Sequence, residues 1–255
     1  IVKAGFKGGK LSSGNMGEEE WIAKRVHARR VGGALQEEHH LADGKVIKVS
    51  DQLMQNGHSV GLRVDMTEFS KAKAAAEANE MLDIAKIEAG SLTIIPTVCD
   101  TSEIVDPVVQ QLTTLSSAKG LEFQVSSDQG SVYVDKVRTR QILFNLVGNA
   151  IKFTEAGRVQ LTVTVDENTA VFEVCDTGNG IPADEYDSIF DAFYQIDSTA
   201  TRRAGGTGMG LAISRSLAEL QGGTLTVAST MGEGSCFSLT LPTTAPSDPN
   251  PGLDA

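Results

Sequence analysis

The sequence has few cysteines and no long apolar run. Its 255 residues include 3 cysteines, Cys99, Cys175 and Cys236, whose odd number and wide separation match neither a disulfide framework nor the spacing of a zinc site. We therefore expect the three thiols to serve as small core hydrophobes in a reducing compartment, the cytoplasm. No apolar stretch approaches the roughly 20 residues needed to cross a bilayer, and the chain opens at Ile1 without a signal-peptide pattern. The sequence thus predicts a soluble piece of a longer protein.

Basic residues are outnumbered by acidic ones. The 22 Lys and Arg residues against 33 Asp and Glu give a net charge of -11, which argues against binding the nucleic-acid backbone as the main role. An anionic ligand would have to be held by local geometry. The content of 40% hydrophobic and 22% charged residues is typical of a globular chain. At about 150 residues per domain, the length favours one large and one small domain.

The first part of the chain, residues 1–66, is predicted to contain a β-hairpin. An Asp-Gly pair and an Asn-Gly pair precede strand-like runs over residues 45–50 and 59–64. His39 and His40 are interpreted as exposed residues of a strand, because surface histidine is common.

A helix is predicted directly after this hairpin. Residues 67–88 are mostly good helix formers, with Thr67 as a cap and Gly90 as a stop. Because Asn79 interrupts the apolar stripe, a connector helix is the economical interpretation, and a coiled-coil seam is the alternative.

Beyond this helix, strands and helices alternate in one long domain over residues 91–242. Asp100 and Glu103 form a capping box that opens an amphipathic helix. The other expected elements are strands over 91–98, 121–125 and 132–134, a helix over 136–153, hairpins of 159–165 with 170–175 and of 224–228 with 236–241, and a last helix over 211–220. Prolines and small polar residues then predict a flexible linker over 243–255.

The first cluster that can carry chemistry is N-L-V-G-N-A-I-K-F-T over residues 145–154. Asn145, Asn149 and Lys152 are spaced four and three apart and share one helix face. Two amides and an ammonium there can face phosphates and a metal ion. Solvated or capping asparagines are the alternative.

The second cluster, D-T-G-N-G-I-P over residues 176–182, follows a strand. It leaves the Asp176 carboxylate at the strand end beside backbone that can approach a flat ligand closely. A buried carboxylate there can accept a hydrogen bond from an exocyclic amine, whereas the alternative is an ordinary turn.

The third cluster, G-G-T-G-M-G-L over residues 205–211, opens the last helix, so its amides and the helix dipole form an anion site suited to phosphate. Arg202 and Arg203 precede it and add charge-assisted contacts. A dinucleotide fingerprint fits poorly, because no strand-helix-strand unit with a following acidic residue accompanies the glycines. The fourth cluster, F-D-A-F-Y over 190–194, is interpreted as a hydrophobic clasp, with core packing as the alternative.

The order of these four clusters resembles the ATP-binding domain of sensor histidine kinases. That domain belongs to a superfamily with gyrase-type topoisomerases, heat-shock chaperones of the ninety-kilodalton class and mismatch-repair ATPases. The clusters are similar to its asparagine box, first glycine box, second glycine box and phenylalanine box. Residues 82–90, L-D-I-A-K-I-E-A-G, resemble the end of the second dimerisation helix, and G-E-G-S over 232–235 resembles a closing glycine box. The resemblance runs from Met81 to Pro242.

The resemblance implies an α+β fold, a two-layer α/β sandwich of the Bergerat type with helices on one face of a mixed sheet. A lid is implied between Phe190 and Gly205. The implied cofactors are ATP and Mg²⁺, with Asn149 on the metal, Asn145 and Lys152 facing phosphates, and Asp176 on the adenine amino group. The whole implied ATP-binding set is Asn145, Asn149, Lys152, Phe153, Asp176, Gly178, Gly180, Ile181, Phe193, Arg202, Arg203, Gly206, Thr207, Gly208, Met209, Gly210 and Leu211.

The N-terminal part has a resemblance of its own. Residues 38–49 and 56–68 are similar to the closing strands and exit motif of a PAS sensor domain. This implies that residues 1–66 are the C-terminal half of a PAS domain, whose ligand pocket is incomplete here. Residues 67–90 would then be a connector helix with a remnant of the dimerisation helix.

One part of the family pattern is missing. Histidine kinases transfer the terminal phosphate of ATP to their own histidine, which begins an H-E-x-R-T-P type sequence. None of His27, His39, His40 and His58 begins such a sequence. Residues 67–88 are also only one helix long, whereas an antiparallel helix pair needs more chain. We expect the acceptor segment to be absent, by natural variation or by deletion, and identify no catalytic residue.

Two classes of function stay open from the sequence. The first is the ATP-binding, phosphoryl-donor domain of a PAS-containing, hybrid sensor histidine kinase in two-component signal transduction. The second is a catalytically inactive, ATP-binding regulatory module. The expected partners are an acceptor-histidine domain, a response-regulator receiver domain and a second copy of the chain bound through the connector helix, without nucleic acid and without a membrane span.

Overall fold

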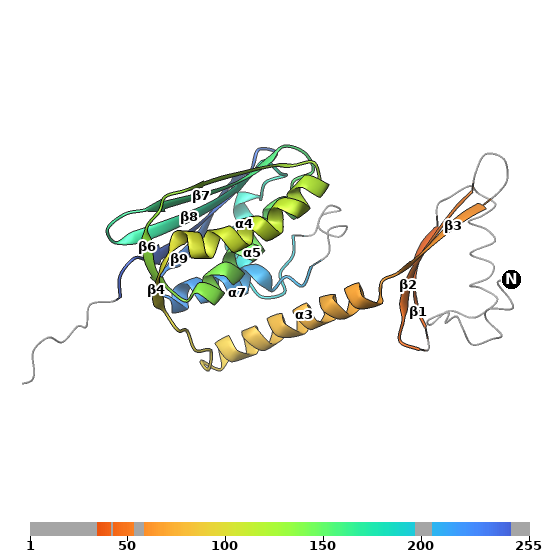
Figure 1. Cartoon of the computed structure of the whole chain (residues 1–255), viewed down its shortest axis with the longest axis horizontal. Coiled ribbons are helices and arrows are strands. Elements are labelled where there is room, and N and C mark those ends of the chain that lie inside the picture. Colours follow the sequence, from red (N-terminus) through yellow and green to blue (C-terminus); the bar gives the residue numbers. More distant parts are fainter. Residues whose placement is uncertain (1–34, 42, 54–58, 197–205, 246–255) are drawn as a thin grey trace, which may run out of the picture. The chain divides into compact units, whose positions relative to one another are not determined.

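A computed structural model describes residues 35–41, 43–53, 59–196 and 206–245 (Figure 1). The chain divides into two compact units, residues 1–79 and 80–255. Helix α3 (Thr67–Glu88) runs through the boundary between them. Within the described ranges, no helix has the length and apolar character needed to cross a membrane.

The first unit contains a three-stranded antiparallel sheet in the order β1-β2-β3. Its strands are β1 (Leu35–His40), β2 (Val46–Leu53) and β3 (Ser59–Asp65). Strands β2 and β3 pair from Ile47 opposite Asp65 to Leu53 opposite Ser59, which confirms the predicted hairpin.

Two local predictions in the first unit are wrong. His39 is buried, whereas His40 is exposed, because neighbours on a strand point to opposite faces and cannot be equally exposed when one face is covered. Thr67 is not the cap of α3. The carbonyl of Met66 accepts the first helical bond, from Ser70 N, and the Asp65 carboxylate accepts from Thr67 N at 2.9 Å.

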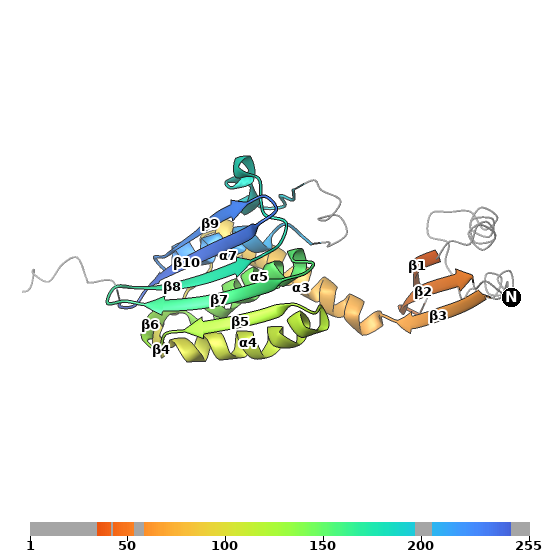
Figure 2. The ribbon, with the colours of Figure 1, turned by 90° about the horizontal axis from the view of Figure 1, so that it is seen from above.

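The second unit is built on a mixed five-stranded sheet in the order β5-β7-β8-β10-β9 (Figure 2). Strands β5 and β7 are parallel and the other neighbours are antiparallel. The strands are β5 (Glu122–Ser127), β7 (Arg158–Val165), β8 (Thr169–Asp176), β9 (Thr224–Thr230) and β10 (Gly234–Pro242), and a separate antiparallel pair is formed by β4 (Thr97–Asp100) and β6 (Ser131–Val134).

Three helices cover one face of this sheet, as Figures 1 and 2 show. They are α4 (Thr101–Ala118), α5 (Lys136–Phe153) and α7 (Gly210–Leu220), and two short 3₁₀ turns, η1 (Ala183–Glu185) and η2 (Ser188–Phe190), precede α7. The core between the layers contains fully buried Leu146 and Leu217 from helices and Phe172 and Leu239 from strands. Each such side chain contributes about 1.5–3 kcal/mol. The two-layer sandwich expected from the resemblance is confirmed.

The strand predicted over residues 91–98 is shorter and later than expected, since β4 begins at Thr97. Pro96 has no N–H to donate to a strand partner, and Ile95 N donates instead to the Asp135 carboxylate at 3.0 Å. The backbone before Thr97 therefore cannot form a ladder.

The beginning of α4 is bonded to α5. The predicted capping box is present, with Asp100 N donating to Glu103 Oε1 at 3.2 Å. Pro107 lies within the helix and lacks the N–H that would bond the Glu103 carbonyl. Arg140 of α5 donates to that carbonyl from Nε at 3.1 Å and from Nη2 at 2.8 Å, so the proline creates an acceptor that joins two helices.

The expectation for the cysteines is wrong for two of the three. Cys175 in β8 and Cys236 in β10 form a disulfide, because the two residues lie directly opposite each other in the antiparallel register. Because the two cysteines are 61 residues apart, the sequence does not indicate that they pair. Cys99 is free and buried in the core, as predicted.

Candidate functional site

The first predicted cluster lies on the C-terminal half of α5. Asp135 caps the start of this helix, since its side chain accepts from Val137 N at 3.0 Å and from Arg138 N at 3.2 Å. Near the other end of α5, Asn149 Nδ2 donates to Asn145 Oδ1 at 3.2 Å, which places the two amides on one face as the spacing predicts.

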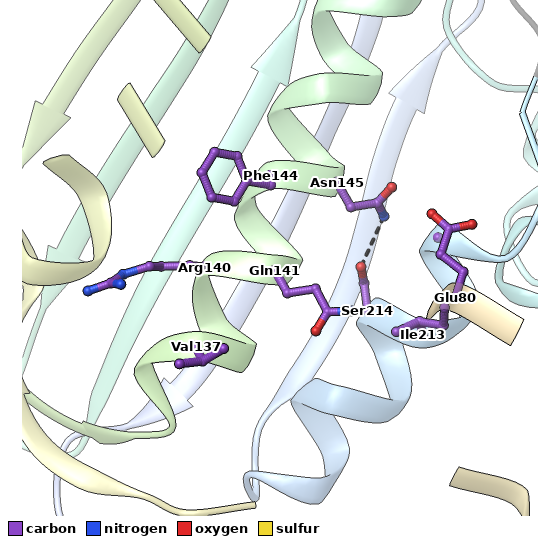
Figure 3. Close-up of a pocket in the computed structure, with 9 residues that line it drawn as sticks. Glu80, Val137, Arg140, Gln141, Phe144, Asn145, Ile213 and Ser214 are labelled. Carbon is purple, nitrogen blue, oxygen red and sulfur yellow. Dashed lines mark hydrogen bonds between the residues drawn. The ribbon is translucent and has the colours of Figure 1, made fainter. Parts of the chain in front are cut away.

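Helix α7 packs against these amides at its first turn. Asn145 Nδ2 donates to Ser214 Oγ at 3.0 Å (Figure 3). A Cβ added at Gly210 would lie 2.4 Å from Asn145 Oδ1, so only glycine allows this close approach. The third cluster, residues 205–211, and the first cluster, residues 145–154, are therefore in direct contact.

Lys152 lies beside the same glycine segment. Its Nζ is 3.0 Å from the place that a Cβ of residue 206 would occupy, and it lies 4.8 Å from the centroid of the Phe153 ring. The Phe153 carbonyl in turn contacts Gly178, since a Cβ there would be 2.6 Å away. The Lys152 ammonium thus lies beside the segment before α7, and the Phe153 carbonyl places the end of α5 against the start of the first glycine loop.

The Asp176 carboxylate lies at the end of β8, as predicted. Its Oδ1 accepts from Gly178 N at 2.8 Å, and the carboxylate also accepts from the backbone N–H of Ser235. Burial raises the pKa of Asp176 despite these two bonds. A carboxylate that is half-buried and bonded on one side can accept from a neutral donor such as an amine.

The loop after Asp176 is bonded to strand β9. Ile181 N donates to Ser229 Oγ at 2.8 Å, and Tyr186 donates from its hydroxyl to the Ser229 carbonyl. Gly180 contacts the carbonyl of Thr230. These bonds hold the loop in one position on the sheet.

The two phenylalanines of the fourth cluster have different environments. Phe190 is buried edge-on against Phe237, with ring centroids 6.4 Å apart, which matches the core-packing alternative. Phe193 is 63% exposed, and its N–H donates to the Gly208 carbonyl at 3.0 Å. The backbone of Phe193 is therefore bonded to the glycine segment that precedes α7, and its ring stays exposed.

The rest of that segment is partly buried. Thr207 donates from Oγ1 to Glu80 Oε2 in α3 at 2.6 Å. Met209 is fully buried in the core, and Leu211 is partly buried against it. Arg202 and Arg203, like most of the predicted lid, lie outside the described residues.

Two polar residues of this site are missing from the predicted set, namely Ser214 and Glu80. Ser214 interrupts the apolar face of α7 one turn after Gly210, and this position is a signal in the sequence. Glu80 has no such signal, because its contact with Thr207 joins residues 127 positions apart.

A cavity of about 510 Å³ adjoins the asparagine end of the site (Figure 3). It lies between α5 and α7 beside α3 and does not reach Asp176. Its lining residues are Glu80, Val137, Arg140, Gln141, Phe144, Asn145, Gly210, Ile213 and Ser214.

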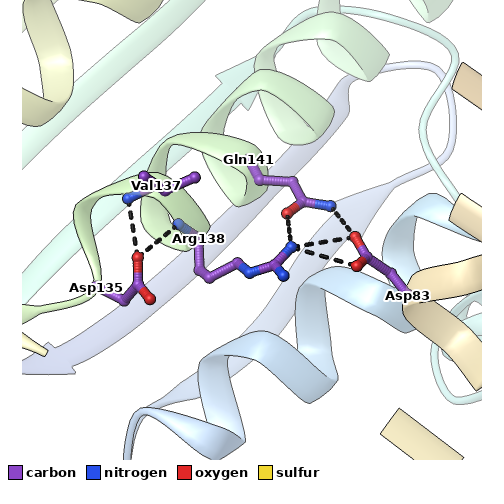
Figure 4. Close-up of polar contacts among 5 residues, drawn as sticks. All are labelled: Asp83, Asp135, Val137, Arg138 and Gln141. Carbon is purple, nitrogen blue, oxygen red and sulfur yellow. Dashed lines mark hydrogen bonds and ion pairs between the residues drawn. The ribbon is translucent and has the colours of Figure 1, made fainter. Parts of the chain in front are cut away.

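The last turns of α3 are bonded to α5 through Asp83. Arg138 Nη1 lies 3.2 Å from Asp83 Oδ2, with side chains 22% and 13% exposed, and Gln141 Nε2 donates to the same oxygen at 2.9 Å (Figure 4). This half-buried network keeps Glu80, one turn earlier, beside the glycine segment.

The donor set at Asn149 fits a hard cation. Mg²⁺ prefers oxygen ligands and takes one or two from protein when phosphates supply others. The Asn149 amide donates its N–H to Asn145 and keeps its carbonyl oxygen for a ligand. Among the described residues, no group of three His, Cys, Asp or Glu side chains could hold a metal ion.

Known proteins share this arrangement. Residues 134–245 match the family model described as histidine kinase-, DNA gyrase B-, and HSP90-like ATPase. The circadian input-output histidine kinase CikA of Synechococcus elongatus is 37% identical over 187 residues, 69% of this chain and 24% of that protein. The aerobic respiration control sensor protein ArcB of Escherichia coli K12 is 42% identical over 170 residues, 64% of this chain and 22% of that protein.

Solved structures agree with these relatives. Full-length ShkA in complex with AMPPNP superposes with a TM-score of 0.62 at 31% identity, over 70% of this chain and 38% of that one. The catalytic domain of histidine kinase ThkA gives a TM-score of 0.52 at 26% identity, over 58% of this chain and 96% of that one. The chain spans less than a quarter of the curated relatives above. It belongs to the sensor histidine kinases and contains their ATP-binding catalytic domain.

Proposed function

We propose that this domain binds ATP with Mg²⁺ and donates the terminal phosphoryl group in two-component signalling. The observation that carries the proposal is the contact of Asn145 and Lys152 with the glycine segment at the start of α7, with the Asp176 carboxylate at a separate end. One end is suited to phosphates and the other to an exocyclic amine. ShkA, a structural relative, was solved in complex with AMPPNP.

Each residue would have a defined task. Asp176 would accept from the adenine amine, Lys152 would neutralise phosphate charge, and the first amides of α7 would bind phosphate oxygens through the helix dipole. Asn149 would hold Mg²⁺ through its carbonyl oxygen. When bound, Mg²⁺ neutralises charge on the phosphate oxygens, and positioning supplies most of the remaining rate enhancement.

Calorimetric titration with ATP, with and without Mg²⁺, tests the site. Mg²⁺ is expected to tighten ATP binding to the unsubstituted chain, and Asn149→Ala is expected to remove that gain, because it deletes the proposed oxygen ligand. Asn168→Ala, in the turn between β7 and β8, is the matched control and should keep the gain. Equal Mg²⁺ dependence in both variants would contradict the metal assignment.

A charge on α3 is expected to oppose ATP binding. Glu80 accepts from the Thr207 hydroxyl, which lies in the proposed phosphate-binding segment, and like charges a few ångströms apart repel by about 1–4 kcal/mol. Glu80→Gln keeps a hydrogen-bond acceptor and removes the charge, so ATP affinity should rise roughly tenfold. The control is Glu88→Gln at the end of α3. A fall in affinity in the Glu80 variant would contradict this.

We infer that the acceptor histidine is supplied by another polypeptide or segment. None of the four histidines carries the family's acceptor pattern, and transfer needs a nucleophile within about 3–3.5 Å of the phosphorus. Incubation with ATP labelled on its terminal phosphate should therefore leave this chain unlabelled and label an added acceptor-helix fragment. Acid-labile label on the chain that disappears in His27→Gln would contradict the inference. An unlabelled acceptor fragment would favour the alternative, an inactive ATP-binding module.

We further propose that residues 1–66 are the C-terminal half of a PAS domain of a hybrid kinase, and that residues 67–90 connect it to an ATP-binding domain over 91–242, followed by the linker 243–255. The β1-β2-β3 sheet, which leads directly into α3, supports this.

None of the residues of α3 is buried in the described part of the chain, and its exposed Phe69, Met81 and Leu82 support dimer formation through this helix. We propose receiver domains as the downstream partners. We also propose a cytoplasmic location for the protein, because ATP is the phosphoryl donor.

A further inference from the structure

Ser214 is a buried polar residue on the inner face of α7. Its side chain is among buried Ile213, Leu217 and Ala218, and the residue is 2% exposed. A hydroxyl in such surroundings costs free energy unless it is hydrogen-bonded. The bond that it makes reaches across to another helix, where Asn145 Nδ2 donates to its Oγ at 3.0 Å.

This bond holds the Asn145 amide against α7. The same amide contacts the next asparagine along α5, since Asn145 Oδ1 accepts from Asn149 Nδ2 at 3.2 Å. The Asn149 carbonyl oxygen is then directed away from Asn145. A chain of two hydrogen bonds thus runs from the core of α7 to the proposed metal ligand.

Gly210 supports the same arrangement from the preceding turn of α7. A Cβ there would lie 2.4 Å from Asn145 Oδ1, so the Asn145 amide occupies space that glycine leaves open. Residues 210 and 214 are one turn apart and therefore face the same side of the helix. Gly210 and Ser214 together form the surface of α7 that contacts the Asn145 amide.

We propose that Ser214 is a positioning residue that holds Asn149 in place for Mg²⁺ through the Asn145 amide. This rests on the proposed function, in which Asn149 holds the metal with ATP. The ordinary alternative is a core serine whose hydroxyl is merely satisfied. The two interpretations differ, because positioning acts mainly on metal-dependent binding, whereas a structural serine acts on stability and on all nucleotide binding alike.

The adenine end of the site gives an internal reference. Asp176 and its two backbone partners, Gly178 and Ser235, lie at the ends of β8 and β10, and no described hydrogen bond connects them to Ser214. Removing the Ser214 hydroxyl should therefore change the affinity for ATP without metal much less than it changes the Mg²⁺-dependent gain.

The test is calorimetric titration of the full chain with ATP, in Mg²⁺ and in chelator. Loss of a direct outer partner of a metal ligand typically costs 10- to 100-fold in metal affinity. Ser214 lies one hydrogen bond further out, so Ser214→Ala should lose up to about tenfold of the Mg²⁺-dependent gain and much less of its affinity in chelator. Ser214→Thr, which retains the hydroxyl, should restore most of that gain. Ser116→Ala is the matched control: Ser116 is buried in α4 and donates to the Thr113 carbonyl at 3.0 Å.

A double-mutant cycle separates positioning from general damage. In an Asn149→Ala background, Ser214→Ala should have no further effect on the Mg²⁺ gain, because the position of a deleted amide no longer matters. Ser214→Ala that weakens binding equally in Mg²⁺ and in chelator, or leaves both unchanged, overturns the positioning role while the proposed function stands. A chain that binds ATP without any Mg²⁺ gain, or whose gain survives Asn149→Ala, overturns both.

Discussion

Asp176→Asn is expected to lower the affinity for ATP by about 10- to 100-fold while leaving the fold intact. The carboxylate accepts from Gly178 N at 2.8 Å and from the Ser235 amide, and a lone pair remains for the adenine amine. An asparagine offers one oxygen, and its N–H₂ would confront the donor of the ligand. A hydrogen bond to a charged group contributes about 1.5–3 kcal/mol, which corresponds to this loss of affinity.

Calorimetry measures this loss, and Glu173→Gln is the matched control. Glu173 lies in the same strand and is bonded to Ser238 Oγ at 3.4 Å, so exchanging its carboxylate for an amide leaves the site unchanged. Equal ATP affinity in the Asp176 variant and the unsubstituted chain would refute the adenine assignment.

The pH dependence of the same variant has a defined sign. Burial raises the pKa of Asp176 in the folded protein, so the carboxyl contributes stability below its unfolded pKa and loses that contribution as the pH rises through its folded pKa. At neutral pH, Asp176→Asn should therefore unfold at the same or a higher temperature than the unsubstituted chain. ATP affinity of the unsubstituted chain should fall as acidification protonates the carboxyl, and that of the variant should not.

Gly234→Ala is expected to cost about 3 kcal/mol or more of stability and to weaken ATP binding. Gly234 has a φ of +122°, and an added Cβ would lie 1.9 Å from the Asp176 carbonyl oxygen and 2.9 Å from the Cα of Thr177. Backbone atoms cannot rotate away, so the two strand ends must separate. The strained φ adds about 1–3 kcal/mol for a residue with a side chain.

Gly232→Ala is the matched control for this effect. Gly232 also has a positive φ, +82°, yet nothing lies within 4 Å of an added Cβ. Its substitution should cost only the backbone strain and leave ATP affinity unchanged. Urea unfolding followed by circular dichroism compares the two variants, and similar losses in both would show that the contact with Asp176 does not matter.

Much of the local structure follows from nearest neighbours along the chain. Helix α5 has the predicted limits because the Asp135 side chain accepts from the first helical amides and an apolar face recurs through Leu146 and Ala150. The hairpin of β9 and β10 likewise follows from alternation around a glycine-rich turn. The shared face of Asn145 and Asn149 needs only the helical period.

Contacts between distant segments could not be predicted from the sequence. The disulfide partners Cys175 and Cys236, the Glu80 carboxylate at Thr207, and the Ser214 hydroxyl at Asn145 each join residues at least 61 positions apart. Local propensity and periodicity carry no information on the register of distant strands or the packing angle of two helices. The sequence by itself therefore determined most of the elements of the second unit, the motifs and their family. Packing of those elements determined that Ser214 contacts Asn145, that Glu80 contacts Thr207 and that Cys175 pairs with Cys236, because these contacts depend on distances that only the assembled sheet and helices define.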